Sequence, residues 1–275
     1  MTLSAAQHDV AAAEIIGRPS GSLWRSLLNA GTFGGQDEML FRGVILEGVA
    51  CSGKSSLLHA LLAHPSFVGR AGASSIVLTE HHTQRVLESN GPRAQLQVQD
   101  NVILLREHTD YLGRIAGRIG RMTRWQERNF GSPRVTAVIE RFHLTHVLNY
   151  EHIEWAHVAD IDGQLAEIGI RLCLVVTAPH ELRRRIRGER AGAWGSFLSE
   201  PGQRGHFAEH PSDEAKVRYF VQQQEALLTL AERSRMPTYQ VDTTGTSPLL
   251  AAEGVLRLLV GDLQAGKPPS LADPP

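Results

Sequence analysis

One loop of this sequence combines the residue types that hold phosphate groups. Residues 48–55 read Gly-Val-Ala-Cys-Ser-Gly-Lys-Ser, the pattern GxxxxGKS, with an apolar run before them and leucines at helical spacing after them. The glycines let backbone N–H groups turn toward phosphate oxygens, Lys54 can reach the terminal phosphates, and Ser55 offers a hydroxyl to Mg²⁺. The predicted nucleotide contacts in this loop are Gly48, Val49, Ala50, Cys51, Ser52, Gly53, Lys54, Ser55 and Ser56.

Two charged residues follow a later apolar run, residues 135–139. Glu140 and Arg141 would stand at the carboxyl end of a strand, beside the phosphate loop. There Glu140 could hold Mg²⁺ through water, and Arg141 could bind phosphate on the acceptor side. The alternative is a carboxylate that caps the next helix and a solvated arginine.

Glu80 follows another apolar run, Ile76–Leu78. Its place at a strand end predicts a side chain that faces the hydroxyl or phosphate of an acceptor molecule, with a catalytic role. A solvated loop carboxylate is the alternative.

An arginine-rich segment follows the apolar run at 172–176. Pro179 is a good first residue for a helix, and five arginines then fall within eight residues. We predict that residues 183–197 form a lid over a transferring phosphoryl group, with Arg187 and Arg190 among the catalytic residues. The alternative is an ordinary charged helix surface.

The elements that must position these side chains follow a regular rhythm. Short runs rich in branched residues alternate with longer helical patterns, which is typical of crossover units in an α/β fold. We expect a five-stranded parallel sheet with helices on both faces, and one or two helices within 94–130. The predicted strands are Val44–Leu46, Ile76–Leu78, Val135–Ile139, Leu172–Val176 and Thr238–Val241.

Composition limits the remaining possibilities. The 275 residues are 42% hydrophobic, enough for one large domain, which we place at 42–263 between an irregular extension at 1–41 and a disordered tail at 264–275. The 28 basic and 29 acidic side chains nearly cancel, which gives no reason to expect a nucleic-acid partner. Two cysteines whose spacing resembles no disulfide framework, and the lack of a long apolar run, predict a cytoplasmic protein without a membrane partner.

The order of these features resembles the thymidylate kinase and deoxynucleoside kinase group of P-loop phosphotransferases over roughly residues 42–260. LEGVACSGKSS resembles the group's first loop, EGxxGxGKST, and ERFHLTHVLNY resembles its DRYxxSxxAYQ. APHELRRRI is similar to PPEVALERI, which leads into the lid, and TYQVDTTGTSP is similar to the last strand and the loop that packs on adenine. The segment Thr79-Glu80-His81-His82 departs from the TREP or EP of that group.

The resemblance implies ATP and Mg²⁺ as cofactors, a nucleotide contact at Thr243, and a homodimer. We therefore expect transfer of the γ-phosphoryl group of Mg·ATP to a small molecule, with a nucleoside or nucleoside monophosphate as the expected acceptor. Two alternatives stay open. One is a kinase of a non-nucleotide hydroxyl, such as an antibiotic or secondary metabolite, and the other is a P-loop nucleotide-binding switch.

Overall fold

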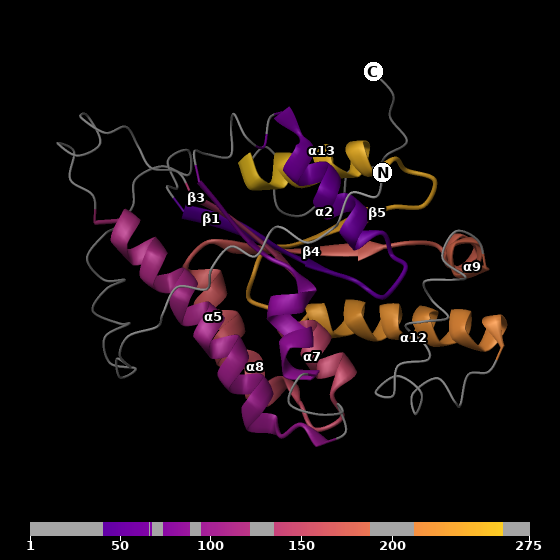
Figure 1. Ribbon diagram of the computed structural model, residues 1–275, viewed down its shortest axis with the longest axis horizontal. Helices are drawn as coiled ribbons and strands as arrows, with labels where there is room; N and C mark the ends of the chain where they lie inside the picture. Colours follow the sequence, from indigo (N-terminus) through magenta and orange to yellow (C-terminus); the bar gives the residue numbers. More distant parts are fainter. Residues whose placement is uncertain are drawn as a thin grey trace, which may run out of the picture. The chain divides into compact units, whose positions relative to one another are not determined.

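Five parallel strands form a single sheet in the order β2-β3-β1-β4-β5 in a computed structural model (Figure 1). Every apolar run predicted as a strand is one, and the parallel pairing is confirmed. β1 begins one residue before the predicted start of the domain. The strands are β1 (Phe41–Glu47), β2 (Ser74–Leu78), β3 (Val135–Glu140), β4 (Ile170–Val176) and β5 (Thr238–Asp242).

The structure describes residues 41–65, 67, 74–88, 95–121, 135–187 and 212–260. Contacts divide the chain into residues 1–34 and 35–275, and all described residues belong to the second unit. The predicted extension, apart from its last residue, lies outside the described residues, as do the predicted tail and residues 188–197 of the predicted lid.

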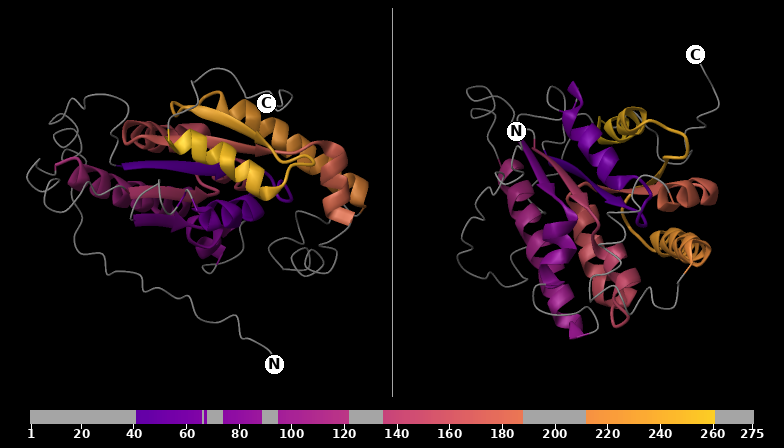
Figure 2. Two further views of the ribbon diagram at one scale, coloured as in Figure 1. Left: turned by 90° about the horizontal axis from the view of Figure 1, so that it is seen from above. Right: turned by 45° about the vertical axis from the view of Figure 1, so that its right-hand side comes forward.

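Helices cover both faces of the sheet, as predicted (Figures 1 and 2). One face carries α2 (Lys54–Ala63) and α13 (Pro248–Val260). The opposite face carries α5 (Val98–Ile119), α7 (His143–Asn149), α8 (Trp155–Glu167) and α12 (Asp213–Ala231). The shorter elements are η2 (His81–Arg85), α4 (Val86–Glu88) and α9 (Pro179–Arg187). None of the described helices is both long and apolar enough to cross a membrane.

Alternate residues of the central strand supply two separate cores. Val44 and Leu46 pack into the core under α2 and α13, whereas Ile45 packs into the core under α5, α8 and α12. A strand that is buried on both faces can be apolar at successive positions, which is why β1 reads as a continuous apolar run instead of an alternating one.

The connections of β1 and β3 leave the sheet on opposite faces. β1 continues into α2, and its neighbour β3 continues into α7 on the other face (Figure 1). A crevice opens at the carboxyl ends of neighbouring parallel strands where the connections diverge in this way. The register places Leu46 of β1, one residue before the end of that strand, opposite Glu140 at the end of β3, so both strands end at this edge.

Candidate functional site

The loop between β1 and α2 has a backbone shape that only its two glycines accommodate. A Cβ on Gly48 would lie 2.5 Å from the Val175 carbonyl oxygen, and Gly53 has φ +92°. Gly53 caps α2 without a side-chain hydrogen bond, and the first turn of that helix contains no acidic residue. The backbone N–H groups of this turn and the positive end of the helix dipole therefore face the loop, which is an arrangement suited to an anion.

Lys54 lies folded across this loop. Its Nζ donates a hydrogen bond to the Val49 carbonyl oxygen at 2.7 Å, and the residue is only 4% exposed. Burial, and next the positive charge of Arg141, lower the pKa of Lys54 from 10.5 to about 7, although Glu140, Glu80 and Glu47 act in the opposite direction. The ammonium group is thus close to neutralisation at physiological pH.

Ser55 and Glu140 meet at the edge of the loop. The Ser55 hydroxyl donates to Glu140 Oε1 at 2.9 Å, and Glu140 is buried at the end of β3. Two hard oxygen ligands beside a phosphate loop fit Mg²⁺, which is commonly bound by one or two carboxylates together with phosphate and water oxygens. The structure therefore brings together the two residues predicted as metal ligands.

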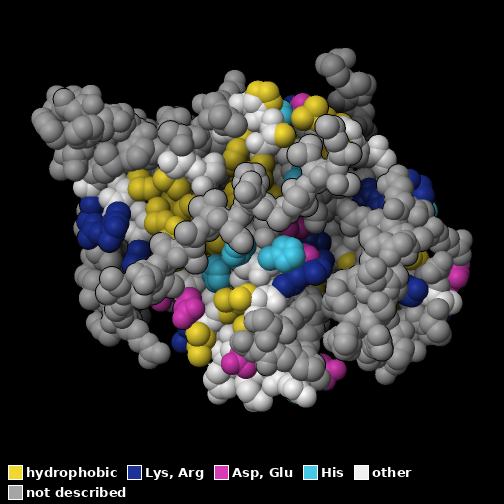
Figure 3. Space-filling view, viewed as in Figure 1, with side chains coloured by type: hydrophobic (Ala, Val, Ile, Leu, Met, Phe, Trp, Pro, Cys, Tyr) yellow, Lys and Arg dark blue, Asp and Glu magenta, His cyan; other side chains and the backbone are white. Residues whose placement is uncertain are grey.

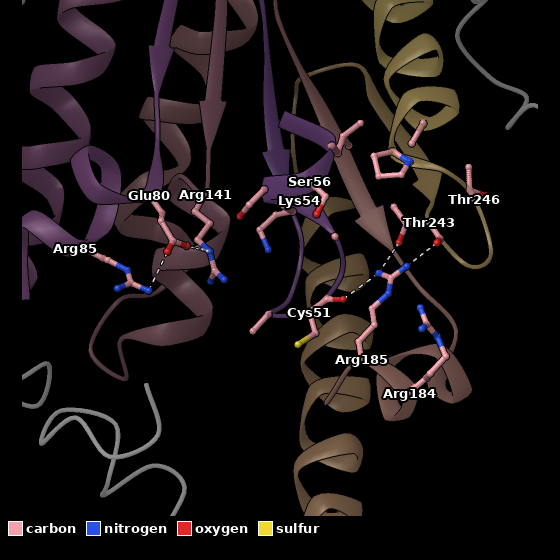
Figure 4. A pocket seen from close by; sticks show the side chains of 16 residues that line it. Cys51, Lys54, Ser56, Glu80, Arg85, Arg141, Arg184, Arg185, Thr243 and Thr246 are labelled. Carbon is pink, nitrogen blue, oxygen red and sulfur yellow. Dashed lines mark hydrogen bonds and ion pairs between the residues drawn. The ribbon is translucent and has the colours of Figure 1, made fainter. Parts of the chain in front are cut away.

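Glu80 lies between two guanidinium groups, in contact with Arg141 from β3's end and Arg85 from η2 (Figure 4). Arg85 Nη2 is 2.9 Å from Glu80 Oε1, and Arg141 Nε is 2.8 Å from Oε2. The Arg141 Nε–H makes no directed hydrogen bond, so this second contact is an ion pair. Burial raises the pKa of Glu80, but Arg141 and then Arg85 outweigh it, and the net shift is downward.

Arg141 adopts an unusual backbone conformation to reach this position. Its φ of +55° lies in the left-handed region, which side chains other than glycine rarely adopt, and its N–H donates to the Leu46 carbonyl oxygen at 3.0 Å. Backbone strain of this kind is found mainly at functional sites, and it persists only where the surrounding structure holds the residue in place.

A buried network of hydrogen bonds holds η2 in place. The Thr83 hydroxyl donates to the Glu140 carbonyl oxygen at 2.8 Å, which ties η2 to the end of β3. His146 of α7 has its Nε2 2.7 Å from the Thr83 carbonyl oxygen and its Nδ1 2.8 Å from Asn101 Oδ1 of α5. Thr83, His146 and Asn101 are all buried, so β3, α7 and α5 together hold the segment that carries Glu80 and Arg85.

Glu47, the last residue of β1, is fully buried and supports the chain that follows β3. Its carboxylate accepts hydrogen bonds from the Phe142 N–H at 2.9 Å, from the Thr145 N–H at 3.4 Å, and from the Thr145 hydroxyl. An acceptor at a helix N-terminus satisfies N–H groups that lack a partner within the helix. Glu47 therefore fixes the start of α7 and the chain that follows Arg141.

Arg185 of α9 fastens the phosphate loop to the loop after β5. Its Nη1 donates to the Cys51 carbonyl oxygen at 3.0 Å, and its Nη2 donates to the Thr243 carbonyl oxygen at 2.7 Å. The Thr243 hydroxyl in turn donates to the Ser52 carbonyl oxygen at 2.6 Å. Glu181, one turn earlier in α9, accepts from Arg185 Nε at 2.7 Å and orients the guanidinium group.

Apolar contacts reinforce this connection. The side chains of Val49 and Cys51 pack into a small core with α9 and α12. Leu182 and Ile186 supply the α9 part of this core, and Phe220 lies on α12. The tip of the loop, α9 and α12 therefore form one packed unit.

A cavity of about 480 Å³ opens over the loop and extends to both sides of it (Figure 4). On one side it is lined by Glu80, Arg85 and Arg141, and on the other by Arg185 and by the residues Thr243, Thr246 and Pro248. On the face seen in Figure 3, histidine side chains lie beside basic and acidic ones at the centre of the molecule.

Most of the predicted site residues meet at this cavity. Those lining it are Ala50, Cys51, Gly53, Lys54, Ser55, Ser56, Glu80, Arg141 and Thr243. Gly48, Val49 and Ser52 shape the loop without lining the cavity. Arg187 is the last residue of α9, but its side chain and the whole of Arg190 lie outside the described residues.

Three arginines that the sequence reasoning did not single out line the cavity: Arg184, and the two that contact other site residues, Arg85 and Arg185. Arg85 stands five residues after Glu80, and Arg185 stands four residues after Glu181. The spacing from Glu181 could have identified Arg185, because residues four apart share a helix face. Arg85 reaches Glu80 through the wider turn of a π-helix, which the sequence pattern did not reveal.

Comparison with known proteins adds no relative. No protein-family model matches this chain, and no curated protein matches its sequence. Function must therefore be inferred from the residues of the cavity and their geometry.

Proposed function

We propose that this protein transfers the γ-phosphoryl group of Mg·ATP to a small acceptor, of which a nucleoside or nucleoside monophosphate is the favoured class. The observation that carries the proposal is the contact between Ser55 and Glu140, 2.9 Å apart at the mouth of a glycine-shaped loop that also holds Lys54. Phosphoryl transfer depends chiefly on positioning and charge stabilisation, and these residues supply both.

Each part of the loop has a definite role in this proposal. Backbone N–H groups of the loop and of the first turn of α2 bind the phosphate oxygens, and Lys54 neutralises the β- and γ-phosphates. Ser55 and Glu140 would hold Mg²⁺, which neutralises charge on the phosphate oxygens when it is bound. Binding of phosphates would draw the Lys54 ammonium group away from the Val49 carbonyl oxygen.

The two sides of the cavity suit the two ends of the reaction. The uncharged side chains of Thr243, Thr246 and Pro248 lie next to the loop and fit the base and sugar of ATP, and Arg184 and Arg185 on the same side suit its phosphates. The side formed by Glu80, Arg85 and Arg141 is charged and fits the acceptor. A second, charged side of the cavity favours a kinase over a nucleotide switch, because a switch needs no second small-molecule site.

A non-nucleotide acceptor is the second candidate. His81 and His82 follow Glu80 where the resembled kinases have a proline, so the sequence beside the acceptor side of the cavity differs from theirs. This difference leaves room for a kinase of another small molecule.

A phosphoryl-transfer screen tests the proposal. Purified protein with Mg·ATP is assayed for ADP release against nucleosides, nucleoside monophosphates and hydroxylated metabolites, together with the Lys54→Ala variant. We expect release that depends on one acceptor class and is lost in the variant, because an uncompensated phosphate charge raises the barrier. Slow hydrolysis that no acceptor accelerates would instead indicate a switch, and wild-type turnover by Lys54→Ala would refute the assignment of the loop.

A further inference from the structure

The carboxylate of Glu80 has both of its oxygen atoms engaged. Oε1 faces Arg85 Nη2 at 2.9 Å, and Oε2 faces Arg141 Nε at 2.8 Å. The three side chains are only partly exposed, at 20% for Glu80, 33% for Arg85 and 17% for Arg141. Partial burial strengthens these ion pairs relative to pairs in water, so Glu80 holds both guanidinium groups at the cavity wall.

This environment makes Glu80 a weak proton acceptor. Burial disfavours its ionised form, but Arg141, Arg85, Lys54 and His81 together outweigh burial and leave its pKa below the ordinary value of 4.5. A general base works best when its pKa lies near the working pH, and its power to remove a proton falls as that pKa falls. An acceptor hydroxyl would therefore gain little from Glu80.

The same environment favours an anion. Two guanidinium groups face a single carboxylate on this side of the cavity, so the acceptor wall has a net positive charge. Guanidinium groups also match phosphate oxygens geometrically, because their planar N–H donors can form paired hydrogen bonds.

We propose that the acceptor is a phosphate monoester, and that Glu80 positions Arg85 and Arg141 to bind its phosphate group. The inference rests on the proposed phosphotransferase function and selects the acceptor class within it. An anionic oxygen of the acceptor phosphate forms a bond to the γ-phosphorus of ATP. The bond from that phosphorus to the β,γ-bridging oxygen breaks, and ADP leaves with the electron pair, so no proton has to be removed.

Calorimetry on matched ligand pairs tests binding separately from turnover. The protein is saturated with Mg²⁺ and a non-hydrolysable ATP analogue, which blocks the ATP site, and is titrated with five nucleosides and their 5′-monophosphates. We expect at least one monophosphate to bind roughly 10- to 100-fold more tightly than its nucleoside, the range for charge-assisted hydrogen bonds. Arg85→Gln should remove most of this advantage. Arg106→Gln in α5, which alters an exposed pair with Asp160 of α8, is the matched control and should retain it.

Kinetics of Glu80→Gln separate positioning from base catalysis. A positioning role predicts a raised KM for the monophosphate with a kcat within a few fold of wild type, and an unchanged KM for ATP. A base role predicts a kcat lower by about 10²- to 10⁴-fold.

The outcomes distinguish the two proposals. Equal or weaker binding of every monophosphate, more efficient phosphorylation of nucleosides, or the large loss of kcat would overturn the monophosphate inference while the kinase stands. Tighter monophosphate binding that Arg85→Gln abolishes, without any phosphoryl transfer, would support the anion site and overturn the proposed function.

Discussion

The hydroxyl of Ser55 donates a hydrogen bond to Glu140 at 2.9 Å, which joins the first turn of α2 to the last residue of β3. Glu140 ends β3, and Ser55 lies in the helix that follows the neighbouring strand β1; the connections of these two strands run to opposite faces of the sheet. Their contact therefore depends on the parallel register of β1 and β3, and it places two oxygen ligands where a phosphate-bound cation would lie.

Glu140→Gln should weaken the dependence of nucleotide binding on Mg²⁺, because an amide is a poorer ligand than a carboxylate for a hard cation. We expect the advantage of Mg·ATP over metal-free ATP to fall by at least roughly tenfold, as measured by calorimetry with and without the metal. Ser55→Ala should act in the same direction. An unaltered Mg²⁺ advantage in both variants would place the cation elsewhere.

Nucleotide binding should take up a proton at alkaline pH. Lys54 has a pKa of about 7 without nucleotide, so it is largely neutral at about pH 8, whereas bound phosphates favour its ammonium form and raise that pKa. ATP affinity should therefore fall by about tenfold per pH unit between about pH 8 and 9, where ATP itself stays fully ionised. Calorimetry in buffers of different ionisation enthalpy measures the proton directly. Lys54→Met should show no uptake in this window, and uptake by that variant would assign the proton to another group.

Gly48→Ala should damage the loop, because the added Cβ would lie 2.5 Å from the Val175 carbonyl oxygen. We expect a loss of ATP affinity of roughly tenfold or more, together with a lower Tm. Gly254→Ala in α13 is the control, since no atom lies within 4 Å of the added Cβ, and it should stabilise the protein by about 0.5–1 kcal/mol. Equal Tm values for the two variants would contradict the close approach at Gly48.

Arg185→Gln should raise the KM for ATP by roughly tenfold, because the two loops beside the nucleotide would lose the guanidinium group that connects them. Arg183→Gln, at an exposed position two residues earlier in α9, should leave this KM unchanged. Steady-state kinetics with varied ATP compare the two variants. The same KM in both would mean that the connection is dispensable for nucleotide binding.

Thr83→Val should disturb the acceptor side selectively. It removes the buried hydroxyl bond to the Glu140 carbonyl oxygen at a cost of about 1–3 kcal/mol in stability, and it loosens the segment that carries Glu80 and Arg85. Thr109→Val is the matched control, since that buried hydroxyl bonds to Leu105 within α5. Both variants should lower Tm, but only Thr83→Val should raise the KM for the acceptor. Parallel changes in that KM would show that general destabilisation is responsible.

The sequence pattern was sufficient to predict the five strands and the loop at residues 48–55. Strands buried on both faces read as short apolar runs, and the spacing in residues 48–55 leaves little freedom for the backbone. Glu80 and Glu140 could be placed beside the loop because each follows a strand, and the carboxyl ends of parallel strands lie at one edge. The strand order was not predicted, since the local pattern does not reveal which runs become neighbours.

The arginines show where sequence reasoning stops. Five of them fall between residues 183 and 190, and nothing in their order reveals which one faces the loop. Arg185 is distinguished by partners distant in the chain, the carbonyl oxygens of Cys51 and Thr243. The capping role of Glu47 was missed for the same reason, because its partners lie about a hundred residues later.

The π turn at η2 affects how a homologue of this protein would be recognised from its sequence. The Val86 N–H bonds to the His81 carbonyl oxygen, a ring that contains one residue more than an α-helical ring. This wider turn returns Arg85 to the side of Glu80, whereas an α-helix would bring residues three and four apart together. A distant homologue with an ordinary helix could present the same pair with one residue fewer. An alignment would then record a gap at a point where the chemistry had been retained.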